Sequence, residues 1–183
     1  ANWASSIIGV SPEYLVARGW PVASGKPIEQ SDVDAAAKVV LLGQTVARSL
    51  FGDSDPVGET VRVRRVPHEV IGVLERKGQS MIGQDQDDIV LIPISTARKR
   101  VLGGNIAKSR NVNSISVKVK DGADLAIAEQ EIRDLLRQRH RLRTGHHCPA
   151  LKATGHGQPV VVGRQHAPAF GDGGKAQALA CKR

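Results

Sequence analysis

The stretch KVVLLGQTVARSLFG, residues 38–52, carries the clearest fold signal in this chain of 183 residues. Residues 39–42 form a continuous apolar run of strand length, which is typical of a strand covered on both faces. Gly43 ends that run, and Gly52 is a natural helix C-cap. Between these two glycines, three apolar side chains recur at helical spacing, namely Val46, Leu50 and Phe51. The stretch therefore predicts a buried strand followed directly by a short helix.

Downstream, the pattern switches to alternation. In residues 60–64 valines alternate with threonine and arginine, which is the period of a half-buried strand. A turn at residues 65–67 and a second strand over residues 70–73 complete a hairpin, so we expect His68 in the turn, at the surface. The β-branched run DIVLIPI predicts a further strand, and Ser95 is the expected N-cap of a helix after it.

The residues upstream of the central stretch predict less regular structure. Residues 3–10 indicate a short strand, and residues 11–20 a turn that leads into a single helical turn. Residues 21–34 are interrupted by proline and glycine, which predicts a loop.

Residues 113–120, NSISVKVK, form the most regular alternation in the chain. The expected inward side chains are Ile115, Val117 and Val119. A helix is predicted over Leu125–Leu142, with Asp124 as its cap. Its apolar stripe consists of Leu125, Ala128, Ile132, Leu135 and Leu136.

The composition changes after Arg143. Residues 144–183 contain seven glycines, both cysteines, five of the 26 basic residues and one of the 18 acidic residues. No sustained helical or strand period runs through them, although PVVV has the composition of a strand. We therefore expect residues 144–183 to be a disordered tail, or one foreign to the rest of the domain.

The bulk composition is that of a globular domain, with 40% hydrophobic and 24% charged residues. No apolar run approaches the roughly 20 residues of a membrane-spanning helix. Strands and helices mix along the chain, so the predicted fold class is α/β or α+β.

The stretch GQSMIGQDQDDIVLIPI, residues 78–94, has three aspartates that begin like a calcium-binding loop. An EF-hand counted from Asp85 needs glycine at its sixth position and glutamate at its twelfth, and neither is present. Carboxylates that act as acid and base need a cleft or nucleophile that no pattern here indicates. The favoured interpretation is that Asp85, Asp87 and Asp88 satisfy loop backbone groups at the entrance of a strand.

Other motifs of functional sites are incomplete. The cluster His146–Cys148 lacks the paired spacing of structural zinc sites, so no metal site is predicted. GDGGKA lacks both the upstream glycine and the following serine or threonine of a phosphate-binding loop. The net charge of +8 permits nucleic-acid binding, but the basic runs at residues 98–100 and 137–143 have no interleaved aromatics. The residues predict no catalytic group and no cofactor.

Several stretches in series resemble one known family, the periplasmic core domain of MacB-type ABC exporter permeases. They are NWASSIIGVSPEYLVARGWPVASGK, AKVVLLGQTVARSLFGDSDPVGETVRV, HEVIGVLERKGQSMIGQDQDDIVLIPISTARKRVLGG and NVNSISVKVKDGADLAIAEQEIRDLLRQRHRL. The likeness is colinear over about residues 2–143.

The resemblance implies an incomplete porter-like α/β part, residues 1–37 and 105–143, with an inserted β-rich part over about residues 38–104. It implies a non-enzymatic domain on the periplasmic side of a bacterial inner-membrane transporter. Such a domain couples cytoplasmic ATP hydrolysis to efflux of an amphiphilic substrate. The implied partners are the transmembrane and ATPase parts, a periplasmic adaptor protein and a second permease copy, with ATP and magnesium only in the ATPase part.

The resemblance includes the loop from Gly78 to Asp88, which is therefore a candidate partner contact. Its candidate residues are Gln79, Ser80, Met81, Gln84, Asp85, Asp87 and Asp88. Two alternatives from other classes stay open, a small hydrolase with an unrecognised site and a weak nucleic-acid-binding module.

Overall fold

The computed structural model describes most of the chain up to residue 140 and two short strands beyond it. The described residues are 2–80, 83, 85–101, 114–120, 122–140, 151–152 and 160–163. They belong to two compact units, residues 1–109 and residues 110–183. Each unit is described by itself.

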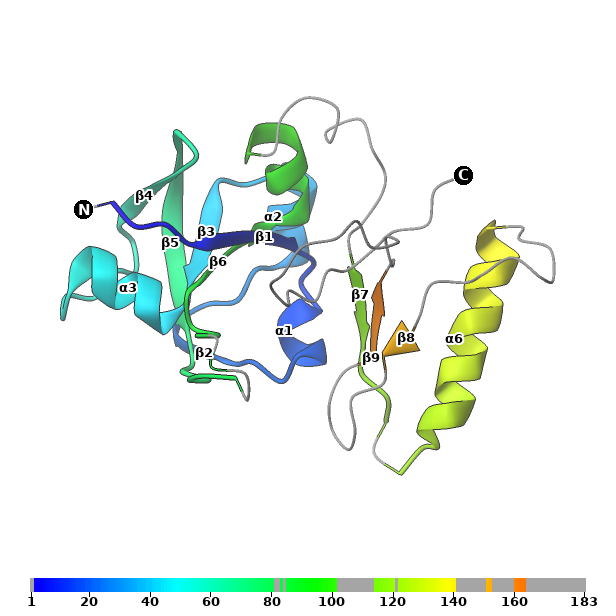
Figure 1. Cartoon of the computed structure of the whole chain (residues 1–183). Coiled ribbons are helices and arrows are strands. Elements are labelled where there is room, and N and C mark those ends of the chain that lie inside the picture. Colours follow the sequence, from blue (N-terminus) through cyan, green and yellow to red (C-terminus); the bar gives the residue numbers. More distant parts are fainter. Residues whose placement is uncertain are drawn as a thin grey trace, which may run out of the picture. The chain divides into compact units, whose positions relative to one another are not determined.

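The first unit is built on a mixed six-stranded sheet with the order β1-β6-β3-β5-β2, in which β4 also pairs with β5 (Figure 1). Strand β1 is parallel to β6 and β3 is parallel to β5, whereas β3–β6, β2–β5 and β4–β5 are antiparallel. Its elements are β1 Ser6–Val10, α1 Tyr14–Ala17, β2 Val22–Gly25, α2 Gln30–Ala35, β3 Val39–Leu42, α3 Gln44–Phe51, β4 Thr60–Val63, β5 Val66–Leu74, β6 Ile89–Pro93, α4 Ile94–Thr96 and the π-helical turn η1 Ala97–Val101.

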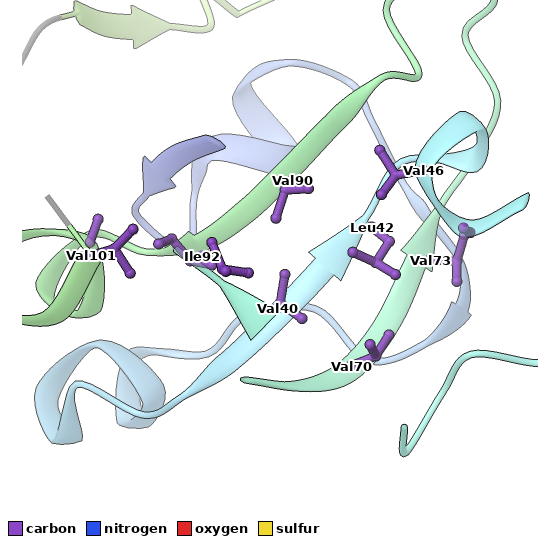
Figure 2. Packing of buried hydrophobic residues seen from close by; sticks show 11 residues of the cluster. Val40, Leu42, Val46, Val70, Val73, Val90, Ile92 and Val101 are labelled. Atoms are coloured by element: carbon purple, nitrogen blue, oxygen red, sulfur yellow. The ribbon is translucent and has the colours of Figure 1, made fainter. Parts of the chain in front are cut away.

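Strand β3 lies in the middle of this sheet and contributes to two hydrophobic clusters. Val40 and Leu42 belong to one cluster, with residues from α3, β5, β6 and η1 (Figure 2). Leu41, whose side chain alternates with theirs, belongs to the other, with Trp20 and residues of β5 and β6. The prediction of a strand covered on both faces is confirmed. The short helix after it is confirmed as α3, whose Val46 is buried in the first cluster.

The hairpin of β4 and β5 turns earlier than predicted. Arg64 and Arg65 are its two turn residues, with φ angles of +46° and +72°, as a two-residue hairpin turn requires. Strand β5 therefore starts at Val66, and His68 pairs with Val61 of β4. The expectation of a surface histidine in the turn is wrong, because His68 is only 1% exposed.

Two elements lie where the sequence predicts a loop. Strand β2 pairs with the end of β5, where Gly25 has a φ of +85° and its Cα lies too close to Ile71 for a side chain. Helix α2 starts after Glu29, whose backbone N–H donates to the Asp32 carboxylate at 3.0 Å. Glycine and proline lie close to the ends of these short elements. Because both residues are typical of loops, the sequence pattern did not predict the strand and the helix between them.

Ser95 does not cap a helix. It lies inside α4, and its hydroxyl donates to the carbonyl of Val33. Pro93 precedes the helix instead, and the backbone continues into the π-helical turn η1. The serine thus fastens α4 to α2, since a polar group that is buried between elements needs a partner.

The sheet of the first unit crosses the predicted boundary near residue 38. Strands β1 and β2 come before it, yet they pair with β6 and β5, which come after it. Pairing with β1 and β2 gives hydrogen-bond partners to β6 and to the end of β5, so these strands fold as one sheet. The boundary between the two compact units falls after residue 109.

The second unit holds helix α6 Leu125–His140 and a three-stranded antiparallel sheet of the order β7-β9-β8. Its strands are β7 Ser114–Val117, β8 Leu151–Lys152 and β9 Val160–Gly163. Asp124 caps the helix as predicted, because its carboxylate accepts a 2.8 Å hydrogen bond from the N–H of Ala126. Strands β8 and β9 fall in the segment expected to be disordered, and for those residues the structure differs from that expectation.

Two side chains predicted to face inward in this unit are exposed. Leu135 is 54% exposed and Ile115 is 42% exposed. On α6 the residues at four-residue intervals, Ala128, Ile132 and Leu136, are half-buried. Leu135 lies about 100° around the helix from Leu136, so it falls on the flank of this stripe.

Candidate partner-binding site

The loop from Gly78 to Asp88 is a folded excursion between β5 and β6. Gln79 and Asp85 form an isolated antiparallel bridge, and the N–H of Gln86 donates to the carbonyl of Gly78 at 3.1 Å. Gly78 and Gly83 both have a φ of +76°, which suits glycine. Two candidate contact residues, Met81 and Gln84, lie outside the described residues.

Asp87 organises the base of this loop. Its side chain is 2% exposed and accepts hydrogen bonds from the backbone N–H groups of Lys77, at 2.8 Å, and Gly78, at 2.9 Å. The guanidinium of Arg76 lies 3.9 Å from the same carboxylate. A buried carboxylate that accepts several bonds is a structural group, so Asp87 holds the base of the loop in place.

Asp85 and Asp88 fasten the loop to other elements. Asp85 accepts a 2.7 Å hydrogen bond from the hydroxyl of Thr45 in α3 and a 2.9 Å bond from the N–H of Asp87. These two bonds, the Thr45 hydroxyl first, hold the pKa of the Asp85 carboxyl below its ordinary value. Asp88 accepts a 2.9 Å bond from the indole N–H of Trp3. Asp85 and Asp87 thus satisfy loop backbone groups as interpreted, whereas Asp88 accepts its bond from a side chain.

The start of the loop is tied to α1 through Lys77. Its ammonium donates to the carbonyl of Arg18 at 2.9 Å and lies 4.8 Å from the centre of the Trp20 ring. The indole N–H of Trp20 in turn donates to the carbonyl of Glu75 at 2.6 Å. Burial lowers the pKa of Lys77, the charge of Arg18 lowers it further, and Asp87 acts in the opposite direction.

The loop therefore presents a subset of its candidate residues. Gln79 and Asp85 are exposed, whereas Ser80 and Asp88 are half-buried. Sequence reasoning missed Arg18, Arg76 and Lys77. The pair Arg76–Lys77 directly precedes the quoted loop and was a usable signal, but nothing in the sequence indicates that Arg18 joins it.

A second feature that the sequence did not reveal is a groove of about 900 Å³, open to solvent, beside α3 and β4. In Figure 1 the chain's N-terminal segment runs along these elements. The floor is apolar and shares side chains with the core, including Leu42, Val46, Leu50, Phe51 and Val90. Trp3 lines the groove as well, so its bond to Asp88 connects groove and loop.

The groups considered next bear on the first of the two alternative functions, a small hydrolase, and not on the second, a nucleic-acid-binding module. No group of three or more His, Cys, Asp or Glu side chains among them is arranged to hold a metal ion. His68 is buried with its Nδ1 2.9 Å from the carbonyl of Val66, and burial, more than any other cause, lowers its pKa. A hydrolase would need a nucleophile beside an accessible base, and the aspartates described above are occupied in the loop.

The family of MacB-like periplasmic core domains matches residues 1–135, and the chain belongs to this family. The resemblance seen in the sequence is confirmed.

Two relatives carry the name macrolide export ATP-binding/permease protein MacB. The one from Rhodospirillum rubrum is 46% identical over 140 residues, which are 76% of this chain and 21% of the relative. The one from Chlorobium luteolum is 38% identical over 144 residues, 79% of this chain and 21% of the relative. The chain thus spans about a fifth of the length of these relatives.

Solved structures give the same fold. The periplasmic region of MacB from Actinobacillus actinomycetemcomitans superposes with a TM-score of 0.60 at 29% identity, covering 74% of this chain and 56% of that one. The extracellular domain of the noncanonic ABC-type transporter YknZ from Gram-positive bacteria gives a TM-score of 0.53 at 20% identity, over 75% of this chain and 65% of that one. Among the described residues, no helix is both long and apolar enough to cross a bilayer.

Proposed function

We propose that this chain is the periplasmic domain of an ABC transporter permease in a bacterial inner membrane. In this role it couples cytoplasmic ATP hydrolysis to export of an amphiphilic substrate. The observation that carries the proposal is the family match over residues 1–135. ATP and magnesium belong to the ATPase part of such a transporter, since this chain contributes no recognisable catalytic motif.

The architecture of the first unit suits a domain that transmits motion. Its sheet is covered by a cluster on each face, and both clusters take residues from β3. A closely packed core of this kind is hardly compressible, so a displacement of one element is passed on to its neighbours. The partner-facing loop is joined to α1, α3 and the N-terminal segment through Lys77, Asp85 and Asp88. A force applied at the loop is therefore passed to the whole sheet.

The proposed partners are a periplasmic adaptor protein and a second copy of the permease. The loop from Gly78 to Asp88 is the proposed adaptor contact, with the exposed Gln79 at its surface. Interfaces combine such exposed polar groups with a few apolar anchors, and Met81 is one of the two apolar residues of the loop, next to Ile82.

The test uses the full-length transporter with the double change Gln79→Ala and Met81→Ala. Export and adaptor binding should fall, while the melting temperature of the protein and its basal ATP hydrolysis stay unchanged. Gln138→Ala, at an exposed position of α6, is the matched control. Full export and full adaptor binding by a correctly folded double variant would overturn the assignment of the loop.

A further inference from the structure

Strand β4 has one free backbone edge. It pairs with β5 and with no other strand in the part of the chain that the structure describes. Pro67 lies opposite Arg62 and has no N–H, so these two residues form a pair without hydrogen bonds between them. The bond from the N–H of Val70 to the carbonyl of Glu59, three residues before Arg62, fits the same alternation. The backbone N–H and C=O groups of Thr60 and Arg62 therefore point away from β5.

This free edge lies in the groove beside α3. All four residues of β4 line the groove, although successive side chains of a strand alternate between its two faces. A strand whose residues all line one groove presents its backbone edge to that groove. Residues 2–5 line the groove as well, and among the described residues no backbone hydrogen bond joins them to β4. The groove thus offers unpaired donors and acceptors to an extended chain.

One face of β4 borders an apolar surface that the fold leaves open. Ile7, Leu50, Phe51 and Val61 pack against the first core cluster but are only half-buried, and all four line the groove. Val63, on the same face of β4 as Val61, is buried in that cluster. Apolar side chains on this face of an added strand would cover the open surface and remove it from water. The groove therefore favours apolar residues at every second position of its occupant.

The opposite face of β4 carries positive charge. Arg62 is exposed there, close in sequence to the exposed Arg64 of the turn, and neither side chain forms an ion pair in the described part of the chain. No aspartate or glutamate is among the described residues that line the groove. A glutamate opposite Arg62 on an added strand would supply the missing negative charge, whereas β4 of a second copy would bring arginines together. The charge therefore favours an acidic partner over a second copy of this chain.

We propose that the groove binds an extended segment of a partner protein in which apolar and acidic residues alternate, and that this segment adds to β4 as an antiparallel strand. Its apolar side chains contact the floor of the groove, its acidic side chains face Arg62, and its backbone bonds to Thr60 and Arg62. Main-chain hydrogen bonds supply affinity in this mode of recognition, and alternate side chains supply specificity. The site goes beyond the proposed function, because it needs neither the loop contact nor export.

The first experiment titrates the full chain with a blocked heptapeptide of alternating valine and glutamate and follows the backbone amides of β4 by NMR. Exchange of the Arg62 N–H with solvent should slow by about tenfold or more, because this group gains an acceptor. Exchange of the Val61 N–H should change far less, since it already bonds to β5. A peptide of four valines followed by three glutamates is the control, and equal binding by it would overturn the proposal in favour of unspecific apolar contact.

Two N-methylated peptides test the backbone pairing without any change in the protein. Directly opposite residues of an antiparallel pair lie on the same face, so the glutamates bond to Thr60 and Arg62 through their own N–H groups. Methylation of the glutamate N–H groups should abolish binding. Methylation of the valine N–H groups should leave the Kd within about threefold, since these groups stay in solvent. Equal binding by the two methylated peptides, or a loss confined to the valine-methylated one, would overturn the antiparallel strand.

A charge reversal tests the acidic face of the occupant. Arg62→Glu should weaken binding of the alternating peptide by about tenfold, because like charges then lie opposite each other. Arg48→Glu is the matched control at an exposed position of α3 that does not line the groove, and its Kd should stay within about threefold of the wild-type value. Equal losses in the two variants would overturn the proposal in favour of diffuse attraction. Melting temperatures of both variants exclude unfolding as the cause.

A second copy of the chain is tested in the absence of peptide. Exchange of the Arg62 N–H should then be independent of protein concentration, because the free edge has no partner. Exchange that slows as the concentration rises would overturn the proposal in favour of pairing between two copies of β4.

Discussion

Strand β3 lies inside its sheet with both faces covered, whereas helix α6 leaves much of its surface in solvent. In β3, Leu41 is fully buried in one cluster and Val40 in the other. In α6, Ile127 and Leu135 are more than half exposed, and its apolar stripe is only half-buried. The two elements show that apolar content alone does not set burial, because burial depends on the layers that surround an element.

The largest expected effect tests this contrast with two identical substitutions. Leu41→Ala should lower the free energy of unfolding by about 2–5 kcal/mol, because it leaves a cavity in a fully packed cluster. Leu135→Ala should change it by only about half a kcal/mol, as at other exposed positions. Urea titrations of the full chain, followed by Trp fluorescence and by the circular dichroism of the helices, measure both changes. Equal losses would contradict the difference in burial.

The junction between β3 and the loop offers the next largest effect. A Cβ atom added at Gly43 would lie 2.1 Å from the backbone carbonyl oxygen of Asp87, which cannot move freely. Gly43→Ala should therefore destabilise the protein by about 1–3 kcal/mol or more. Gly52→Ala meets no neighbouring atom and is strained only by its φ of +64°, so its cost should be about 1 kcal/mol. Thermal melts of both variants separate the steric clash expected at Gly43 from the backbone strain expected at Gly52. A larger loss of stability in Gly52→Ala than in Gly43→Ala would refute the clash.

The same contrast explains which parts of the fold the sequence could predict. Local patterns were sufficient for β3, α3 and the cap at Asp124, because each depends on neighbouring residues or on a period of the chain. They failed for His68 and Ser95, whose surroundings are supplied by β4 and α2 across the sheet or between helices. Asp85 and Asp87 were assigned correctly as acceptors of loop N–H groups, but the Thr45 and Trp3 groups that donate to Asp85 and Asp88 come from distant segments. Tertiary contacts of this kind leave no local signal.

Within the loop, the aspartates should differ as their burial does. Asp87→Asn keeps the size of the side chain but removes its charge and replaces one acceptor oxygen with a donor. It should lower the free energy of unfolding by about 1–3 kcal/mol, because buried backbone N–H groups lose an acceptor. Asp85→Asn, at an exposed position, should cause a smaller loss. Chemical denaturation and amide exchange at Lys77 and Gly78 measure the effect, and equal losses would refute a special role for Asp87.

The smallest expected effect concerns His68, which is as deeply buried as β3 but carries a titratable ring. Its Nε2 has no partner among the described residues, and burial lowers its pKa below 6.5, helped by the charges of Lys38 and Arg100. The unfolded chain therefore binds a proton more readily than the folded one at this group. The contribution of His68 to stability is therefore fully present above about pH 6.5 and is lost as the pH falls through the folded pKa.

His68→Gln removes this titration and keeps a polar side chain of comparable length. The melting temperature of the wild-type chain should fall more steeply than that of the variant between pH 7 and pH 5, a window chosen around the ordinary histidine pKa of about 6.5. At pH 7 and above the two proteins should differ by a constant amount, since His68 is neutral in both states of the wild type there. Parallel melting curves across the whole range would show that His68 does not titrate in this window, and that its burial has no consequence for acid stability.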